Sequence, residues 1–241
     1  MVKQILFNGK FSNEEFNLLI SEPPTVSISN ENIEVISVPG RSGSLTKKLG
    51  TYNDKVITVK FKLVEPDLWT YEDSLRNITE WLNIIKNNKL YLDAYNFEDY
   101  YYRVKYCEIG DIQRQLNWYG EFEVKFICEP FKYSSIKNIN IKEDTNIYCS
   151  STIDTEPVIT VDGVGDITLT IGNNSIIFKD ITDTITIDSE MLMCYKNVDG
   201  IYTNMNKHMN GDYPKLKKGS NQISFIGNVT NINIKYENKF L

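Results

Sequence analysis

Apolar and polar residues alternate along most of this chain, with the two-residue period of half-buried β-strands. The clearest runs are residues 56–63 and 122–128, in which every second residue is apolar. A strand of this kind buries one face and exposes the other to water, which is typical of an antiparallel sheet. The pattern therefore predicts a protein that is mainly β, with sheets covered on one side.

One segment follows a different period. Its apolar residues recur at spacings of three and four, which is the stripe of an amphipathic helix; they are Leu75, Ile78, Trp81, Leu82 and Ile85. The spacing predicts a single helix near residues 71–86.

The composition changes after Tyr133, where residues 134–155 become polar and rich in Asn and Lys. We therefore expect an N-terminal domain over 1–133, which contains the helix, and a C-terminal domain over 134–241. Short strands in the second half are separated by turn residues about every ten positions, with one turn expected at Asp162–Asp166. That spacing indicates a β-sandwich or jelly roll.

A glycine-punctuated basic segment, Pro39–Gly50, lies between two predicted strands. Proline fixes φ and glycine permits positive φ, so we expect sharp turns followed by an exposed cationic loop. The segment does not follow the spacing of a phosphate-binding loop, and it precedes a strand rather than a helix. Its role is therefore expected in contacts with other molecules, and its candidate interface residues are Gly40, Arg41, Gly43, Lys47 and Lys48.

The sequence holds little that could carry out a reaction. The one histidine, His208, lies in a polar stretch, and no nucleophile elbow accompanies it. The four cysteines lack metal-ligand spacing, and we expect Cys107 and Cys128 to be free, buried side chains. We therefore predict no enzyme activity, no metal and no cofactor.

Charge and hydropathy exclude two further classes of partner. The formal net charge is −6 and the pI about 5.0, which argues against direct nucleic-acid binding. No run of 18 apolar residues is present, so no membrane span is predicted.

Several motifs, in order along the chain, together resemble the siphophage distal tail protein family. The first is the block from Glu34 through Val38-Pro-Gly-Arg-x-Gly-x-Leu45 to Gly50-Thr-Tyr-Asn-Asp. The helix motif Arg76-x-Ile-x-x-Trp-Leu82 follows, and then the strand Phe122-x-Val-x-Phe-x-Cys-x-Pro130. In the second half, Glu156-Pro-Val-Ile and the Pro214-x-Leu-x-x-Gly segment are also similar to the family.

The resemblance implies a hexameric ring at the distal end of a phage tail. It implies an N-terminal ring-forming, split-barrel-like α+β domain and an outward-facing, galectin-like β-sandwich. The implied partners are the tail tube protein, the tail-associated or tail-tip protein and, in some phages, receptor-binding proteins. The implied location is the virion tail tip, after assembly in the cytoplasm of the bacterial host.

An alternative function is a carbohydrate-binding module that acts in recognition of the host surface. Likeness of fold does not by itself transfer a sugar site, so this alternative needs a site of its own.

Overall fold

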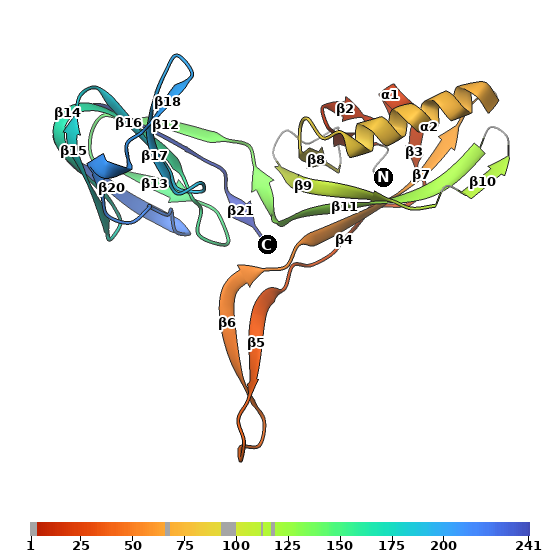
Figure 1. Ribbon diagram of the computed structural model, residues 1–241, viewed down its shortest axis with the longest axis horizontal. Coiled ribbons are helices and arrows are strands. Elements are labelled where there is room, and N and C mark those ends of the chain that lie inside the picture. The colour runs from red at the N-terminus through yellow and green to blue at the C-terminus, as the bar shows by residue number, and fades with distance from the viewer. Residues whose placement is uncertain (1–3, 66–67, 93–99, 112, 117–118) are drawn as a thin grey trace. The chain divides into compact units, whose positions relative to one another are not determined.

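The computed structural model describes residues 4–65, 68–92, 100–111, 113–116 and 119–241. The chain forms two compact units (Figure 1). Unit 1 comprises residues 1–133 together with Leu241, and unit 2 comprises residues 134–240. Strands dominate both, so the prediction of a mainly β protein is confirmed.

Unit 1 is built on one antiparallel sheet in the order β2-β1-β8-β9-β11-β7-β3. β4 also pairs with β7, and β10 pairs with β11, while β5 and β6 form a separate two-stranded sheet. The elements are β1 (Leu6–Phe7), β2 (Lys10–Phe11), α1 (Ser12–Phe16), β3 (Leu18–Ile20), β4 (Thr25–Val26), β5 (Glu31–Ser37), β6 (Ser44–Tyr52), β7 (Lys55–Val64), α2 (Leu68–Asn83), β8 (Lys89–Tyr91), β9 (Tyr100–Ile109), β10 (Gln113–Leu116) and β11 (Tyr119–Ser134).

The pair β7–β11 forms the centre of the unit 1 core. The register places Phe61 opposite Phe122, with their rings 5.7 Å apart, and Val59 opposite Val124. The apolar residues predicted to be buried in β7 are all fully buried; they are Ile57, Val59, Phe61 and Leu63. Each such side chain contributes roughly 1.5–3 kcal/mol through removal from water.

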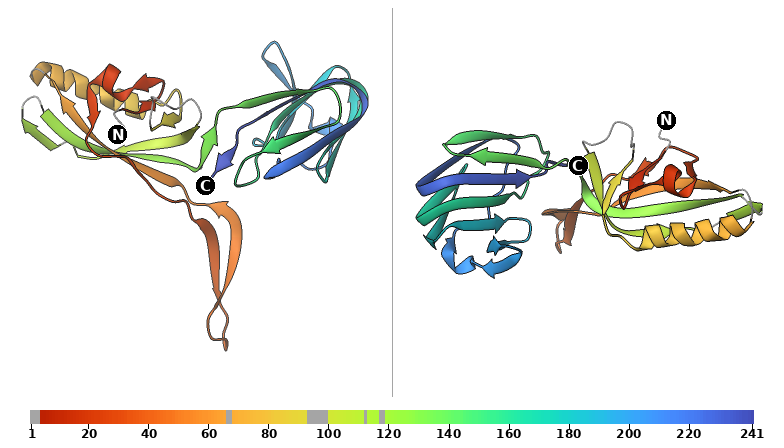
Figure 2. Two further views of the ribbon diagram at one scale, coloured as in Figure 1. Left: turned by 180° about the vertical axis from the view of Figure 1, so that it is seen from behind. Right: turned by 90° about the horizontal axis from the view of Figure 1, so that it is seen from above.

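The helix α2 covers one face of this sheet (Figure 2). Ile78, Trp81 and Leu82 are buried against the strands, as the apolar stripe predicts. The helix spans Leu68–Asn83, however, so the predicted bounds of 71–86 are wrong by three residues at each end.

The early end of α2 has a tertiary cause. The side chain of Asn8 donates hydrogen bonds to the carbonyls of Trp81 (3.0 Å) and Ile84 (2.6 Å). Its Oδ1 accepts hydrogen bonds from the backbone N–H groups of Lys86 and Asn87. Asn8 therefore caps the helix from the turn between β1 and β2, which local sequence around the helix does not reveal.

A second helix, the five-residue α1, was not predicted. It is too short to show a helical period, and it ends at Asn17 in the left-handed conformation, with φ 53°.

Unit 2 consists of a nine-stranded sheet in the order β12-β20-β14-β16-β17-β18, with β13, β15 and β19 paired alongside. The elements are β12 (Lys137–Ile141), β13 (Thr145–Cys149), β14 (Val158–Ile171), β15 (Asn174–Ile181), β16 (Thr184–Asp188), β17 (Met193–Val198), β18 (Ile201–Asn204), η1 (Asn206–His208), β19 (Met209–Asn210), β20 (Gly219–Tyr236) and β21 (Lys239–Phe240). β14 and β20 change partners along their length, so the sheet curls around a core rich in isoleucine (Figure 2).

The expected turn at Asp162–Asp166 is wrong, because β14 runs through this stretch. Bulges against β20 at Asp162/Gly163 and Val164/Thr168 absorb the irregularity. A Cβ at Gly163 would lie 2.5 Å from the carbonyl oxygen of Asn228, so the glycine here allows close approach of two strands.

Candidate functional site

The segment singled out from the sequence forms a two-stranded arm, defined here as β5, β6 and the turn between them. Ser37 pairs with Ser44, and Gly40 and Gly43 have positive φ values of 79° and 82°. The predicted loop over Pro39–Gly50 is therefore too long, because strand β6 begins at Ser44. Leu45, Lys47 and Leu49 share one face of β6. Because a lysine stands between the two leucines, no apolar–polar alternation marks this strand in the sequence.

The base of the arm is fixed to the rest of unit 1. The Tyr52 ring packs edge-on against Phe131 of β11, with 5.6 Å between their centroids. Ser29 Oγ donates a hydrogen bond to the Pro130 carbonyl at 2.8 Å, and Asn53 N–H donates to the Asn30 carbonyl. Beyond these contacts, every residue from Ile33 to Ser37 and from Ser44 to Thr51 is exposed.

The arm is less cationic than the sequence predicts. Lys48 Nζ lies 2.6 Å from Glu31 Oε2, and Lys47 Nζ lies 3.8 Å from Glu34 Oε2. The hydrogen bond with Glu31 raises the pKa of Lys48. Arg41, at the tip, forms no ion pair with any residue that the structure describes. The predicted basic patch is therefore a nearly neutral ribbon with one uncompensated arginine.

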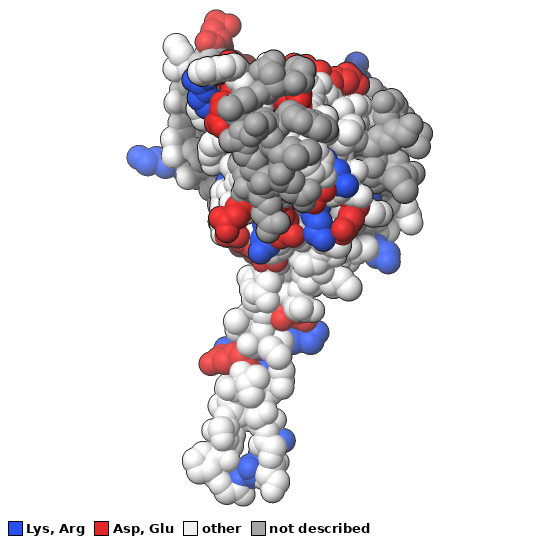
Figure 3. Space-filling model, turned by 90° about the vertical axis from the view of Figure 1, so that its right-hand side faces the viewer, with Lys and Arg blue, Asp and Glu red and all other residues white. Residues whose placement is uncertain are grey.

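The prominent property of the arm is uncovered apolar surface. Five apolar side chains are between 40% and 62% exposed; they are Ile33, Val35, Ile36, Leu45 and Leu49. The register puts Ile36 beside Leu45 on one face, while Val35 lies on the other, so both faces carry apolar groups. In Figure 3 the arm is a narrow, mostly uncharged projection of unit 1. Sequence reasoning concentrated on the glycines and cations and missed these residues.

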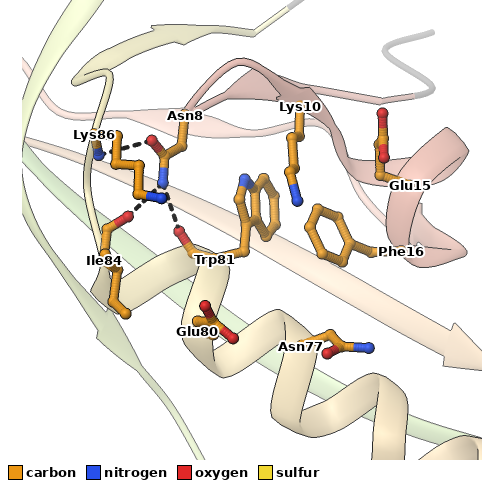
Figure 4. A pocket seen from close by; sticks show the side chains of 9 residues that line it. All are labelled: Asn8, Lys10, Glu15, Phe16, Asn77, Glu80, Trp81, Ile84 and Lys86. Carbon is orange, nitrogen blue, oxygen red and sulfur yellow. Dashed lines mark hydrogen bonds between the residues drawn. The ribbon is translucent and has the colours of Figure 1, made fainter.

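A groove of 390 Å³ lies beside α2, between it and the β1–β2 turn (Figure 4). Phe16 and Trp81 stack with centroids 4.5 Å apart, and the Lys10 ammonium lies 5.4 Å from the centre of the Phe16 ring. Trp81 Nε1 donates to the Phe7 carbonyl, and the Asn8 side chain caps the helix. Because these polar groups already have partners, the groove is mainly a packing junction between α1 and α2.

The candidate chemical groups are not assembled into a centre. His208 Nδ1 lies 2.8 Å from the Lys179 carbonyl, and no group of three or more potential metal ligands occurs among the described residues. All four cysteines are free; Cys128 is buried, as predicted, whereas Cys107 is only partly buried. Burial raises the pKa of Cys107 and Cys128 to about 12 and that of Cys194 to about 11, so these thiols stay protonated at neutral pH.

In the part of the chain that the structure describes, no helix has the length and apolarity needed to cross a bilayer.

Comparison with known proteins shows which proteins this chain is similar to. Residues 10–128 match the family described as phage tail protein RIFT-related domain. The crystal structure of the SPP1 Dit (gp 19.1) protein matches with a TM-score of 0.74 at 12% identity, over 100% of both chains. Residues 10–128 therefore form a domain of this phage tail protein family, and the whole chain has the fold of the SPP1 protein.

A second solved structure extends the likeness of fold to another phage. A chain of the phage P2 baseplate, in its activated conformation with Ca, matches with a TM-score of 0.51 at 11% identity. The match covers 99% of this chain and 98% of the baseplate chain. The SPP1 protein is described as a paradigm of the hub adsorption apparatus in phages that infect Gram-positive bacteria. A search of the curated proteins gives no match. The matching family is one of phage tail proteins, and this chain is a structural tail protein.

Proposed function

We propose that six copies of this chain form a closed ring at the distal end of a siphophage tail. The ring joins the tail tube protein to the tail-associated or tail-tip protein, after assembly in the bacterial host cytoplasm. Unit 1 forms the ring, and unit 2, as a galectin-like domain, faces outward, where it is available to carry receptor-binding proteins. The observation that carries the proposal is the arm, whose apolar side chains lack cover within a single chain.

The physical basis is the weakness of an isolated hairpin. Two strands without a third strand or a helix are marginally stable in water, because they bury little apolar surface. Packing of the arm on a neighbouring copy would bury Val35, Ile36 and Leu45 together with their neighbours. A contact between two different surfaces of the same chain, repeated by rotation, closes into a ring. The edges of β5 and β6 also offer backbone groups for strand addition.

The five candidate interface residues have distinct places in this contact. Gly40 and Gly43 shape the tip, and Arg41 offers the uncompensated charge to an acidic partner. Lys47 and Lys48 hold β6 to β5 through Glu34 and Glu31, so their part in the interface is indirect.

The test is the native mass of the purified full chain and of a variant with Ile33, Val35 and Leu45 replaced by threonine. Threonine keeps the preference for extended backbone while it removes apolar surface. We expect the native chain to have several times the 27.9 kDa mass of one copy by light scattering, and the variant to be a monomer.

The matched control replaces three exposed apolar residues of unit 2, Ile136, Val164 and Ile226, by threonine. This control should keep the native oligomer. A monomeric native chain under tail-assembly conditions, with purified tube protein present, would contradict the ring. An unchanged oligomer in the arm variant would instead exclude the arm as its interface.

A further inference from the structure

Unit 2 contains a cavity whose lining is part polar and part apolar. Its volume is 540 Å³, and it lies beside the β14–β15 turn, the segment before β20, and Asp154. This size falls in the range of small-molecule sites in proteins, which is roughly 300–1,000 Å³. The lining residues include Asp154, Asn173, Asp212, Tyr213, Lys217 and Ser220.

The backbone around the cavity is held in place by hydrogen bonds. Thr155 and Leu216 exchange two backbone hydrogen bonds, at 2.9 and 2.8 Å. Asn174 Nδ2 donates to the Asp212 carbonyl at 3.0 Å. The buried Asn221 side chain accepts from Lys217 N–H and donates to the Lys217 carbonyl, both at 2.8 Å. The walls are therefore set before a ligand arrives, which lowers the entropic cost of binding.

The side chains that line these walls are uncommitted. Among the described residues, the Asp154 and Asp212 carboxylates, the Asn173 amide and the Lys217 ammonium make no side-chain hydrogen bond or ion pair. Lys215 also lines the cavity, but its ammonium lies 3.2 Å from Glu156, which fixes its direction. Several free donors and acceptors thus line one preformed cavity.

The mixture of charges selects the class of ligand. Because Lys215 already pairs with Glu156, the free charges of the lining are two carboxylates, Asp154 and Asp212, and one lysine, Lys217. The lining therefore offers strong hydrogen-bond acceptors beside a charged donor. A sugar hydroxyl donates to a carboxylate and accepts from an ammonium or amide, so it can use both kinds of group at once. Tyr213, half-buried beside Ile171, adds an aromatic ring to the apolar part of the lining.

We propose that unit 2 binds a neutral saccharide in this cavity, with Asp154 and Asp212 as the main acceptors of its hydroxyl groups. The site goes beyond the ring function, because none of its residues belongs to the arm. In a tail component it would give each copy a weak contact with a glycan, and repeated copies would strengthen that contact through multivalency.

The test titrates the full chain with methyl glucoside, methyl galactoside and N-acetylglucosamine, followed by saturation-transfer NMR and calorimetry. We expect at least one of these sugars to bind with a Kd on the order of 1 mM. The double variant Asp154→Asn and Asp212→Asn should lower the affinity for that sugar by at least about tenfold, because charge-assisted hydrogen bonds become neutral ones.

The matched control is Glu143→Gln with Asp199→Asn, which removes two exposed carboxylates of unit 2 that do not line the cavity. It should bind the sugar as the native chain does. Absence of binding by all three sugars, or equal affinity in the cavity variant, would overturn the proposal. Binding of inorganic phosphate in place of the sugars would overturn it too. The cavity variant should keep the native mass, so failure of this site is distinguishable from failure of the ring.

Discussion

Strands β6 and β7 follow one another in the chain and both carry apolar side chains, yet their surroundings differ completely. In β7, Ile57, Val59 and Phe61 are fully buried beneath α2 and beside β11. In β6, Leu45 is 41% exposed and Leu49 is 50% exposed. Both strands contain apolar residues, but the sequence does not say whether these residues are covered by this chain or by another molecule.

The largest expected effect is on the free energy of unfolding, which should respond to a substitution in β7 far more than to one on the arm. Phe61→Ala should lower the free energy of unfolding of unit 1 by about 3–5 kcal/mol, because it leaves a cavity in a packed core. Val35→Ala on the arm should change it by less than about 0.5 kcal/mol in the monomeric chain. Urea unfolding followed by tryptophan fluorescence measures both, since Trp69, Trp81 and Trp118 all belong to unit 1.

If the two substitutions lowered the free energy of unfolding equally, the proposed difference between the arm and β7 would be wrong. Equal effects would mean that the arm packs on its own chain in solution and is unavailable to a neighbour.

The sequence predicts most of β5, β7 and β11 because their alternation is local. It does not predict the extent of β6, since Lys47, Lys48 and Gly50 look like loop residues until Glu31 and Glu34 are seen across the ladder. The extent of β6 is fixed by pairing with residues of β5 that are distant in the sequence. The sequence alone does not reveal which residues pair.

Two further errors have the same origin. The end of α2 depends on Asn8, more than 70 residues away in the chain. The continuity of β14 depends on Gly163, where a side chain would collide with β20. For the candidate site, the turn at Gly40 and Gly43 follows from local conformational rules, whereas exposure of Val35 and Leu45 depends on the absence of a covering layer.

A smaller effect concerns the tip of the arm. Gly43 has a φ of 82° and open space around its Cβ position, so Gly43→Ala introduces backbone strain but no collision. We expect a local cost of about 1 kcal/mol, which appears as roughly fivefold faster amide hydrogen exchange in β5 and β6. Exchange in β7 should not change, because a separate core holds that strand.

Gly43→Asn is the control for this substitution, because asparagine tolerates the left-handed conformation better than alanine. Its exchange rates should lie between those of the native chain and those of Gly43→Ala. Acceleration in β7 as large as that in the arm would show that the two strands open as one unit.

The smallest effect compares two exposed ion pairs, Lys48–Glu31 on the arm and Lys60–Glu22 on the wet face of β7. In each pair the hydrogen bond with glutamate raises the pKa of the lysine above 10.5. A raised pKa in the folded state means that the stabilisation is present below pH 10.5 and is lost as the pH rises through the folded value. Glu31→Gln should lower the pKa of Lys48, measured from its ¹³Cε shift, and leave that of Lys60 unchanged. If the titration of Lys48 does not respond while Glu22→Gln shifts that of Lys60, the ladder of the free arm is open in solution. The arm would then reach its paired form only against a neighbouring copy.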